Sequence, residues 1–157
     1  MKKSGTADGD LQRIWFAARQ RDWSSLALIP SDASADVGRL AEMLVSTGQL
    51  HGERPVAMVN ARGVKLEDVE QVIDSVEAIA ARAERAIVPV DPITDNPAAI
   101  AILRACSAVV LVVRLGESRL ADAQNAIEIV GRDRFLGTVM LEEPGPDVLT
   151  SVKPARP

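Results

Sequence analysis

Three runs of apolar residues mark the second half of the chain, and segments with helix-like spacing separate them. The clearest run is AVVLVVR (108–114), with AIVPVD (86–91) before it and FLGTVML (135–141) after it. Six consecutive apolar residues are typical of a strand buried on both faces, because burial on one face alone gives an alternation of apolar and polar residues. The pattern therefore predicts a parallel sheet with helices packed on it.

Two more strands are predicted earlier in the chain, at SLALIP (25–30) and PVAMVN (55–60). Between the strands, apolar residues recur at helical spacing. The helices that this spacing predicts cover residues 10–23, 37–48, 66–84, 98–106 and 119–131. The fold class is therefore α/β, a three-layer sandwich around a mostly parallel sheet of about five strands. A ligand site is expected at the carboxyl ends of these strands.

The length of 157 residues and the lack of an internal repeat favour a single domain. Residues 1–9 are small and polar and are expected to be flexible, residues 10–143 hold the predicted α/β domain, and the proline-rich residues 144–157 are expected to form a tail. No apolar run reaches the ~18 residues of a transmembrane helix, and the first residues do not resemble a signal peptide. We therefore expect a cytoplasmic protein that does not insert into a membrane.

Charge and composition argue against several classes of function. The net charge is −4, the pI is about 5.1 and the 18 basic residues are scattered, so a nucleic-acid-binding protein is not expected. Tyrosine is absent, and with it any tyrosine phosphorylation site. The single cysteine, Cys106, excludes an internal disulfide and has apolar neighbours that predict a core position. The single histidine, His51, lies in a polar turn, so neither a catalytic triad nor a histidine metal site is expected.

Three of the four aromatic residues lie in the first predicted helix: Trp15, Phe16 and Trp23. The apolar side of this helix predicts that it packs against the edge of the sheet; this side is formed by Leu11, Ile14, Trp15 and Ala18. Because aromatic residues are enriched at protein interfaces, the same three side chains are also candidates for binding a protein partner. We favour the packing interpretation.

Asp91, at the end of the third strand, suggests two catalytic interpretations. It could form an acid pair with Asp95, although an aspartate in the loop DPITDNP is more typical of a turn or a helix cap. In a phosphoacceptor receiver domain, Asp91 would be the acceptor. Such a domain also needs an acidic pair where Ile29 and Pro30 stand and a lysine where Glu142 stands, so the receiver interpretation lacks key residues.

A possible anion site follows the fourth strand. Arg114 and Arg119 flank the turn there, and Ser118 is placed to cap the next helix. Basic side chains beside the start of a helix can hold an anion. Salt bridges from these arginines to Glu117 or Asp122 are the alternative.

The order of these segments resembles a known family. Residues 88–143 are similar to the corresponding part of bacterial tyrosine kinases of the polysaccharide-export type, which form a branch of the P-loop NTPase fold with the MinD and ParA ATPases. The shared pieces are a strand ending in Asp-Pro, a Gly-x-Ser/Thr-Arg turn and a final Leu-Gly-x-Val strand. In this chain they are Asp91–Pro92, Gly116–Arg119 and Leu136–Val139. The resemblance covers most of residues 25–143 and implies a P-loop-like fold.

The phosphate-binding loop of that family is missing. A working member carries a glycine-rich loop ending in Gly-Lys-Ser/Thr after the first strand, where it holds phosphates and Mg²⁺. This chain has PSDASADVGRL (30–40) there, with Asp32, Ser34 and Asp36 in place of the loop and no lysine. Two unit charges ~4 Å apart interact by ~4 kcal/mol at an effective dielectric of about 20, so we expect the aspartates to repel a triphosphate.

The second strand departs from the family as well, because its members end this strand in an aspartate-rich phrase that supports the metal and the catalytic water. Here the sequence is VNARG (59–63), in which Asn60 lacks the charge and Arg62 stands where a second acid is expected. Asp91 is retained at the Mg²⁺-supporting position of the third strand. An isolated carboxylate is poor support for Mg²⁺. No catalytic residue, metal or cofactor is therefore expected.

Together these features predict a catalytically silent, P-loop-like protein. The resemblance then implies an accessory or regulatory interaction module in exopolysaccharide biosynthesis or export, with a membrane-bound polysaccharide co-polymerase or an active kinase as its partner. Such a partner would hold this cytoplasmic protein peripherally at the inner membrane, and self-association into a homo-oligomer is a further implication. The alternative is an active ATP-binding ATPase or kinase with an atypical phosphate loop.

Overall fold

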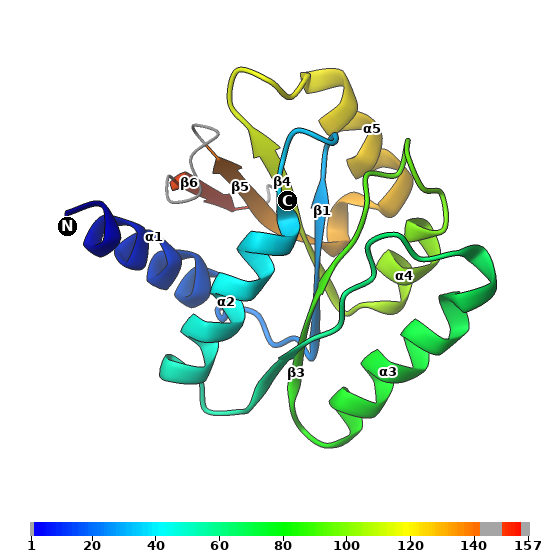
Figure 1. Ribbon diagram of the computed structural model, residues 1–157, viewed down its shortest axis with the longest axis horizontal. Helices are drawn as coiled ribbons and strands as arrows, with labels where there is room; N and C mark the ends of the chain where they lie inside the picture. The colour runs from blue at the N-terminus through cyan, green and yellow to red at the C-terminus, as the bar shows by residue number, and fades with distance from the viewer. Residues whose placement is uncertain (1, 142–148, 155–157) are drawn as a thin grey trace.

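The computed structural model describes residues 2–141 and 149–154, and six strands within them form one sheet: β1 (Ser25–Pro30), β2 (Val56–Met58), β3 (Arg85–Pro89), β4 (Ala108–Arg114), β5 (Phe135–Leu141) and β6 (Leu149–Pro154). The strand order is β2-β3-β1-β4-β5-β6 (Figure 1). Strands β1 to β5 are parallel, and β6 runs antiparallel to β5. The predicted α/β class with a mostly parallel sheet is therefore confirmed.

The predicted C-terminal tail needs a correction, because part of it is a strand. Residues Leu149–Pro154 form β6, in which Val152 pairs with Val139 of β5. Thr150 and Val152 are β-branched residues of the kind that favour strands. The other residues of the predicted tail, 144–148 and 155–157, lie outside the described residues.

Five α-helices flank the sheet in the described part of the chain: α1 (Lys2–Ala18), α2 (Val37–His51), α3 (Val69–Ala81), α4 (Ala99–Ala105) and α5 (Leu120–Val130). None of them is long and apolar enough to cross a membrane. Helix α1 begins at Lys2, inside the segment predicted to be flexible, and ends at Ala18 instead of Trp23. The indole Nε1–H of Trp23 donates to the Ala18 carbonyl over 3.0 Å and satisfies one of the free acceptors at the end of the helix.

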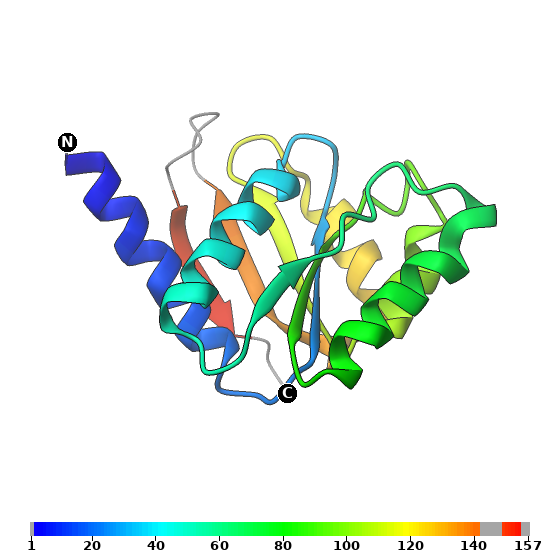
Figure 2. The ribbon, with the colours of Figure 1, turned by 60° about the horizontal axis from the view of Figure 1, so that its bottom comes forward.

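Helices α1 and α2 cover one face of the sheet, and α3, α4 and α5 cover the other (Figures 1 and 2). Successive residues of β1 alternate between the two faces. Leu26 and Leu28 pack with α1 and α2, whereas Ala27 and Ile29 pack with α3, α4 and α5. Each fully buried leucine or isoleucine contributes about 1.5–3 kcal/mol, which explains why the central strands are apolar throughout. Cys106 is buried on the second face, as predicted, and burial raises the pKa of its thiol to about 12.

Trp15 and Trp23 belong to the core, as the favoured packing interpretation predicts, and are therefore not available to a partner. Their side chains are 1% and 2% exposed, and their rings meet edge to face with centroids 5.9 Å apart. The Trp15 ring reaches α2 at Gly48, where a β-carbon would lie 2.6 Å from it. Glycine at this position admits the ring, and α2 continues past it to His51. Of the three aromatic candidates, Phe16 is the one left on the surface, at 49% exposed.

The connections after β1 and β3 leave the sheet in opposite directions. From β1 the chain passes through α2 to β2 at the edge, and from β3 it passes through α4 to β4 on the other side of β1. Such a switch point forms a crevice outside the carboxyl ends of the strands, where ligands of open α/β sheets bind. This order also differs from the 2-1-3-4-5 order of flavodoxin-like receiver domains, so the receiver interpretation is excluded.

Candidate functional site

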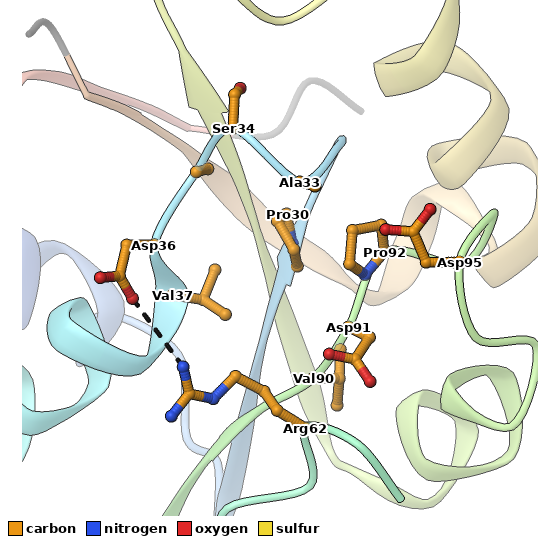
Figure 3. Close-up of a pocket in the computed structure, with 11 residues that line it drawn as sticks. Pro30, Ala33, Ser34, Asp36, Val37, Arg62, Val90, Asp91, Pro92 and Asp95 are labelled. Atoms are coloured by element: carbon orange, nitrogen blue, oxygen red, sulfur yellow. Dashed lines mark ion pairs between the residues drawn. The ribbon is translucent and has the colours of Figure 1, made fainter. Parts of the chain in front are cut away.

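A cavity of about 450 Å³ opens at this crevice. Its walls are the loop after β1, the loop after β3 and the side chain of Arg62 from the loop after β2 (Figure 3). The lining carries the carboxylates of Asp36, Asp91 and Asp95 together with the single guanidinium of Arg62. The volume lies within the range of small-molecule sites, but the lining is polar and predominantly acidic.

Asp32 and Ser34 are hydrogen-bonded to each other within the loop after β1. The backbone N–H of Ser34 donates to Asp32 Oδ1 over 2.9 Å, and the Ser34 hydroxyl donates to the same oxygen. The Ser118 hydroxyl, 3.4 Å from that of Ser34, and the backbone N–H of Arg119 also act as donors to this carboxylate. Burial raises the pKa of Asp32, but these hydrogen bonds together outweigh burial and hold it below its ordinary value. The charge of the Asp32 carboxylate is therefore stabilised by hydrogen bonds from the loops after β1 and β4.

Arg62 crosses from the loop after β2 to the start of α2 (Figure 3). Its Nη1 lies 3.9 Å from Oδ1 of Asp36, the N-cap residue of α2, whose carboxylate also accepts the N–H of Arg39 over 3.1 Å. The guanidinium lies over Gly38, where a β-carbon would come within 2.1 Å of Nη1. A cation thus occupies the helix N-terminus, the place where α/β proteins commonly bind phosphate. Arg62, from a loop distant in the sequence, therefore partly neutralises the charge of Asp36.

Asn60 and Asp91 hold the loops that follow β2 and β3. The backbone N–H and Nε of Arg62 both donate to Asn60 Oδ1 over 3.1 Å. Asp91 Oδ2 accepts the N–H of Gly63 over 2.6 Å and the side-chain Nδ2 of Asn96 over 3.0 Å. Gly63 has a φ of 73°, a conformation that glycine adopts without strain. Asp91, the residue expected to support Mg²⁺, therefore joins two loops.

The groups of the expected anion site bond to other parts of the protein. Arg114 Nη1 donates to the Ser34 carbonyl over 3.2 Å, and the Arg114 backbone N–H donates to Ser118 Oγ over 2.9 Å. Ser118 does not cap α5, because the N-cap residue is Arg119. Arg119 forms the alternative salt bridge, with its Nε 3.6 Å from Asp122 Oδ2. These contacts, with the Asp32 bonds, join the loop after β4 to the loop after β1.

The predicted residues of the degenerate nucleotide site divide into two groups. Ser34, Asp36 and Asp91 line the cavity, whereas Asp32 and Asn60 make hydrogen bonds beside it. The sequence marks Arg62 only as a basic residue where the resemblance implies an acid, and does not predict that its side chain reaches the cavity. Gly38 inside the first turn of a helix is a second signal, because glycine leaves room for a side chain from another loop.

Among the described residues, no group of three or more histidine, cysteine, aspartate or glutamate side chains is arranged to hold a metal ion. His51 lies at the end of α2 opposite the cavity, where its ring centroid is 5.8 Å from that of Phe16.

No protein-family model matches the sequence, and no curated protein matches it. Hydrogen bonds and an ion pair between charged and polar groups at the strand ends connect the four loops that follow β1, β2, β3 and β4.

Proposed function

We propose that this protein is a catalytically silent relative of the P-loop ATPases and bacterial tyrosine kinases, and that it acts as a protein-interaction module. The position of Arg62 carries the proposal. Its guanidinium lies over Gly38 at the start of α2, with Asp36 beside it. A nucleotide-binding relative needs free backbone N–H groups at this helix start to receive phosphate. A nucleotide here would have to displace the guanidinium and approach the carboxylates that line the cavity.

The hydrogen bonds of Asp91 support the same proposal. A Mg²⁺ ion that accompanies a nucleotide is held by one or two carboxylates together with phosphate oxygens. Asp91 Oδ2 already accepts two donors, the N–H of Gly63 and the amide of Asn96. An ion at this oxygen would have to compete with both of them.

The proposed cellular role follows from the resemblance of residues 88–143 to polysaccharide-export tyrosine kinases. A scaffold of this kind without nucleotide chemistry acts through its surface. We infer an accessory or regulatory protein in exopolysaccharide biosynthesis or export, held at the inner membrane by a polysaccharide co-polymerase or an active kinase. Self-association, as in the resembling kinases, belongs to the same proposal.

The alternative is an active ATPase or kinase with an atypical phosphate loop. One observation favours it: Asp91 and Arg62 line a cavity of about 450 Å³ at the switch point of the sheet, where ligands of such folds bind. In that case Arg62 would swing away from Gly38 and contact phosphate oxygens.

Calorimetry with ATP and Mg²⁺ tests the two functions. We expect no binding heat from the wild-type protein, and micromolar affinity would contradict the silent function. If the wild type does bind ATP, Arg62→Ala is the informative variant, because it loses ATP binding only if the arginine contacts phosphate. The role in the pathway is tested by sedimentation of the protein with the purified polysaccharide kinase and with the cytoplasmic part of the co-polymerase from the same cell. Failure to co-sediment with either would contradict it.

A further inference from the structure

The ends of α1 and α2 and the start of β3 lie together on the side of the molecule opposite the cavity (Figure 2), and three arginines belong to these segments. Arg19 follows the last residue of α1, Arg54 lies between α2 and β2, and Arg85 is the first residue of β3. The chain as a whole has a net charge of −4. A basic cluster therefore runs against the average charge of the protein and needs an explanation of its own.

Arg54 and Arg85 converge on one acceptor, the backbone carbonyl of Trp23. Arg54 Nη2 and Arg85 Nη1 donate to it over 3.0 and 3.1 Å. Two nitrogens bound to one oxygen at these lengths are at most about 6 Å apart, a separation at which two like charges repel. The Arg85 guanidinium also lies over the Trp23 ring, 4.6 Å from its centroid. The buried Trp23 therefore fixes the position of the Arg85 guanidinium, next to the guanidinium of Arg54.

The cluster retains hydrogen-bonding capacity. Arg54 Nε is buried and has no hydrogen-bond partner among the described residues, which is a costly state for a charged donor. The contacts of Arg19 are long, 3.5 Å to the His51 carbonyl and 3.8 Å to Glu53 Oε1. The Glu53 side chain is 86% exposed, so this ion pair is weak. A carboxylate supplied from outside could take up the weakly held donors of Arg19 and balance the charge of Arg54.

The charges around the cluster leave it basic. The pKa of Arg85 is lowered first by burial and then by the positive charges of Arg54 and Arg19. Asp22 and Glu53 act in the opposite direction but do not cancel these effects. Among the described residues, the three arginines outnumber the two acids that act on Arg85, and an added carboxylate would relieve the repulsion between the arginines.

Apolar surface borders the arginines. Phe16 lies three residues before Arg19, is 49% exposed, and contacts the ring of His51. Leu50, next to His51 in the chain, is 80% exposed. Because Arg19 contacts the His51 carbonyl and Phe16 contacts the His51 ring, Phe16 lies beside Arg19.

We propose that Arg19, Arg54 and Arg85, with Phe16 beside them, bind an acidic peptide segment of a protein partner. Guanidinium groups match carboxylates in a two-bond geometry, and the exposed ring suits an apolar residue next to the acids. A local cluster with two acids beside it, on a protein of net negative charge, fits a short mixed segment better than a nucleic acid or an anionic membrane. This inference rests on the proposed function as an interaction module and adds a docking surface and the chemistry of the partner.

The test is an NMR titration of the ¹⁵N-labelled full chain with a short, end-blocked peptide of glutamate and leucine residues. We expect the indole signal of Trp23 to shift, because Arg85 stacks on that ring. Arg19→Gln and Arg54→Gln should each weaken binding about tenfold, the loss expected for one charge-assisted contact. Arg104→Gln is the matched control, since Arg104 is an exposed arginine of α4 on the opposite face of the sheet.

Several outcomes would overturn the proposal. These are no shift with the glutamate peptide, equal affinity for a lysine peptide or for inorganic phosphate, and an equal loss of binding in Arg104→Gln. If Arg54→Gln fails to fold, Arg19→Gln carries the test, because Arg19 does not bond to the Trp23 carbonyl. No nucleotide takes part in this titration, so its failure leaves the ATP experiment untouched. Likewise, ATP binding would contradict the silent function without altering the peptide result.

Discussion

The guanidinium of Arg62 lies directly over the α-carbon of Gly38: a β-carbon there would come within 2.1 Å of Nη1 and 2.2 Å of Cζ. Asn60 holds the arginine on one side and Asp36 attracts it on the other. The contact places a positive charge at the start of α2, where bound phosphate is stabilised in many α/β proteins. The proposed lack of nucleotide chemistry depends on this relationship more than on any other.

Because of this contact, Gly38→Ala and Arg62→Ala should have non-additive effects on the free energy of unfolding. Alanine is favoured over glycine within a helix by roughly 0.5–1 kcal/mol, but in the wild type the new β-carbon must push the guanidinium away from Asn60 and Asp36. We therefore expect Gly38→Ala to raise the free energy of unfolding less in the wild type than in an Arg62→Ala background. Urea unfolding of the wild type, both single variants and the double variant measures the difference. Strictly additive effects would contradict the contact.

The same substitution at Gly48 should destabilise the protein. A β-carbon at Gly48 would lie 2.6 Å from the Trp15 ring and 2.9 Å from Val56 Cγ2. Both side chains are buried and cannot move aside as a surface guanidinium can, so we expect a loss of about 1–3 kcal/mol in the free energy of unfolding. Gly38→Ala is the matched control in the same helix. Equal effects at the two positions would argue against the packing of α1 on α2.

Asp91→Ala should lower the free energy of unfolding by about 1–3 kcal/mol, because the N–H of Gly63 and the amide of Asn96 lose their acceptor. Asp91→Asn retains an acceptor oxygen and should lose less. For the wild type and both variants, we expect the thermal unfolding midpoint to be the same with and without Mg²⁺. A Mg²⁺-dependent stabilisation that disappears in Asp91→Ala would identify a metal ligand and contradict the structural role.

Asp32 should contribute stability that depends on pH. Hydrogen bonds hold its folded pKa below the ordinary value of 3.8, so the folded state binds its proton less readily than the unfolded state does. The contribution is therefore present above that ordinary value and is lost as the pH falls through the lower, folded value. Urea unfolding of the wild type and Asp32→Asn over a pH series should show a difference that is constant near neutrality and narrows in acid. A difference that widens on acidification would refute the assignment.

The accuracy of the strand predictions depends on where each strand lies in the sheet. The predicted bounds 25–30, 108–114 and 135–141 coincide with β1, β4 and β5. Buried strands leave long apolar runs, which are a local signal. The edge strands are less clear: β2 is shorter than predicted, and β6 lies in a segment expected to be a tail. A strand at an edge pairs on one side, so its sequence is less constrained.

The candidate site was predictable in place but not in its contacts. The carboxyl ends of the strands follow from the α/β pattern, and Ser34, Asp36 and Asp91 do line the cavity there. The contact between Arg62 and Gly38 does not follow from that pattern, because it joins the loop after β2 to the start of α2. Helical spacing does place Trp15 on the apolar face with Leu11 and Ile14, but it cannot show that the ring reaches Gly48 of α2.

The order of residues along the chain was enough to predict a parallel α/β fold and to show that the loop after the first strand carries no lysine. These properties depend on hydrophobic periodicity and on residue identity, both of which are local. The pairing of Arg62 with Asp36, and the convergence of Arg54 and Arg85 on Trp23, emerged from the folded chain. They depend on β3 lying between β2 and β1, since that strand order determines which distant loops meet and therefore which charges lie side by side.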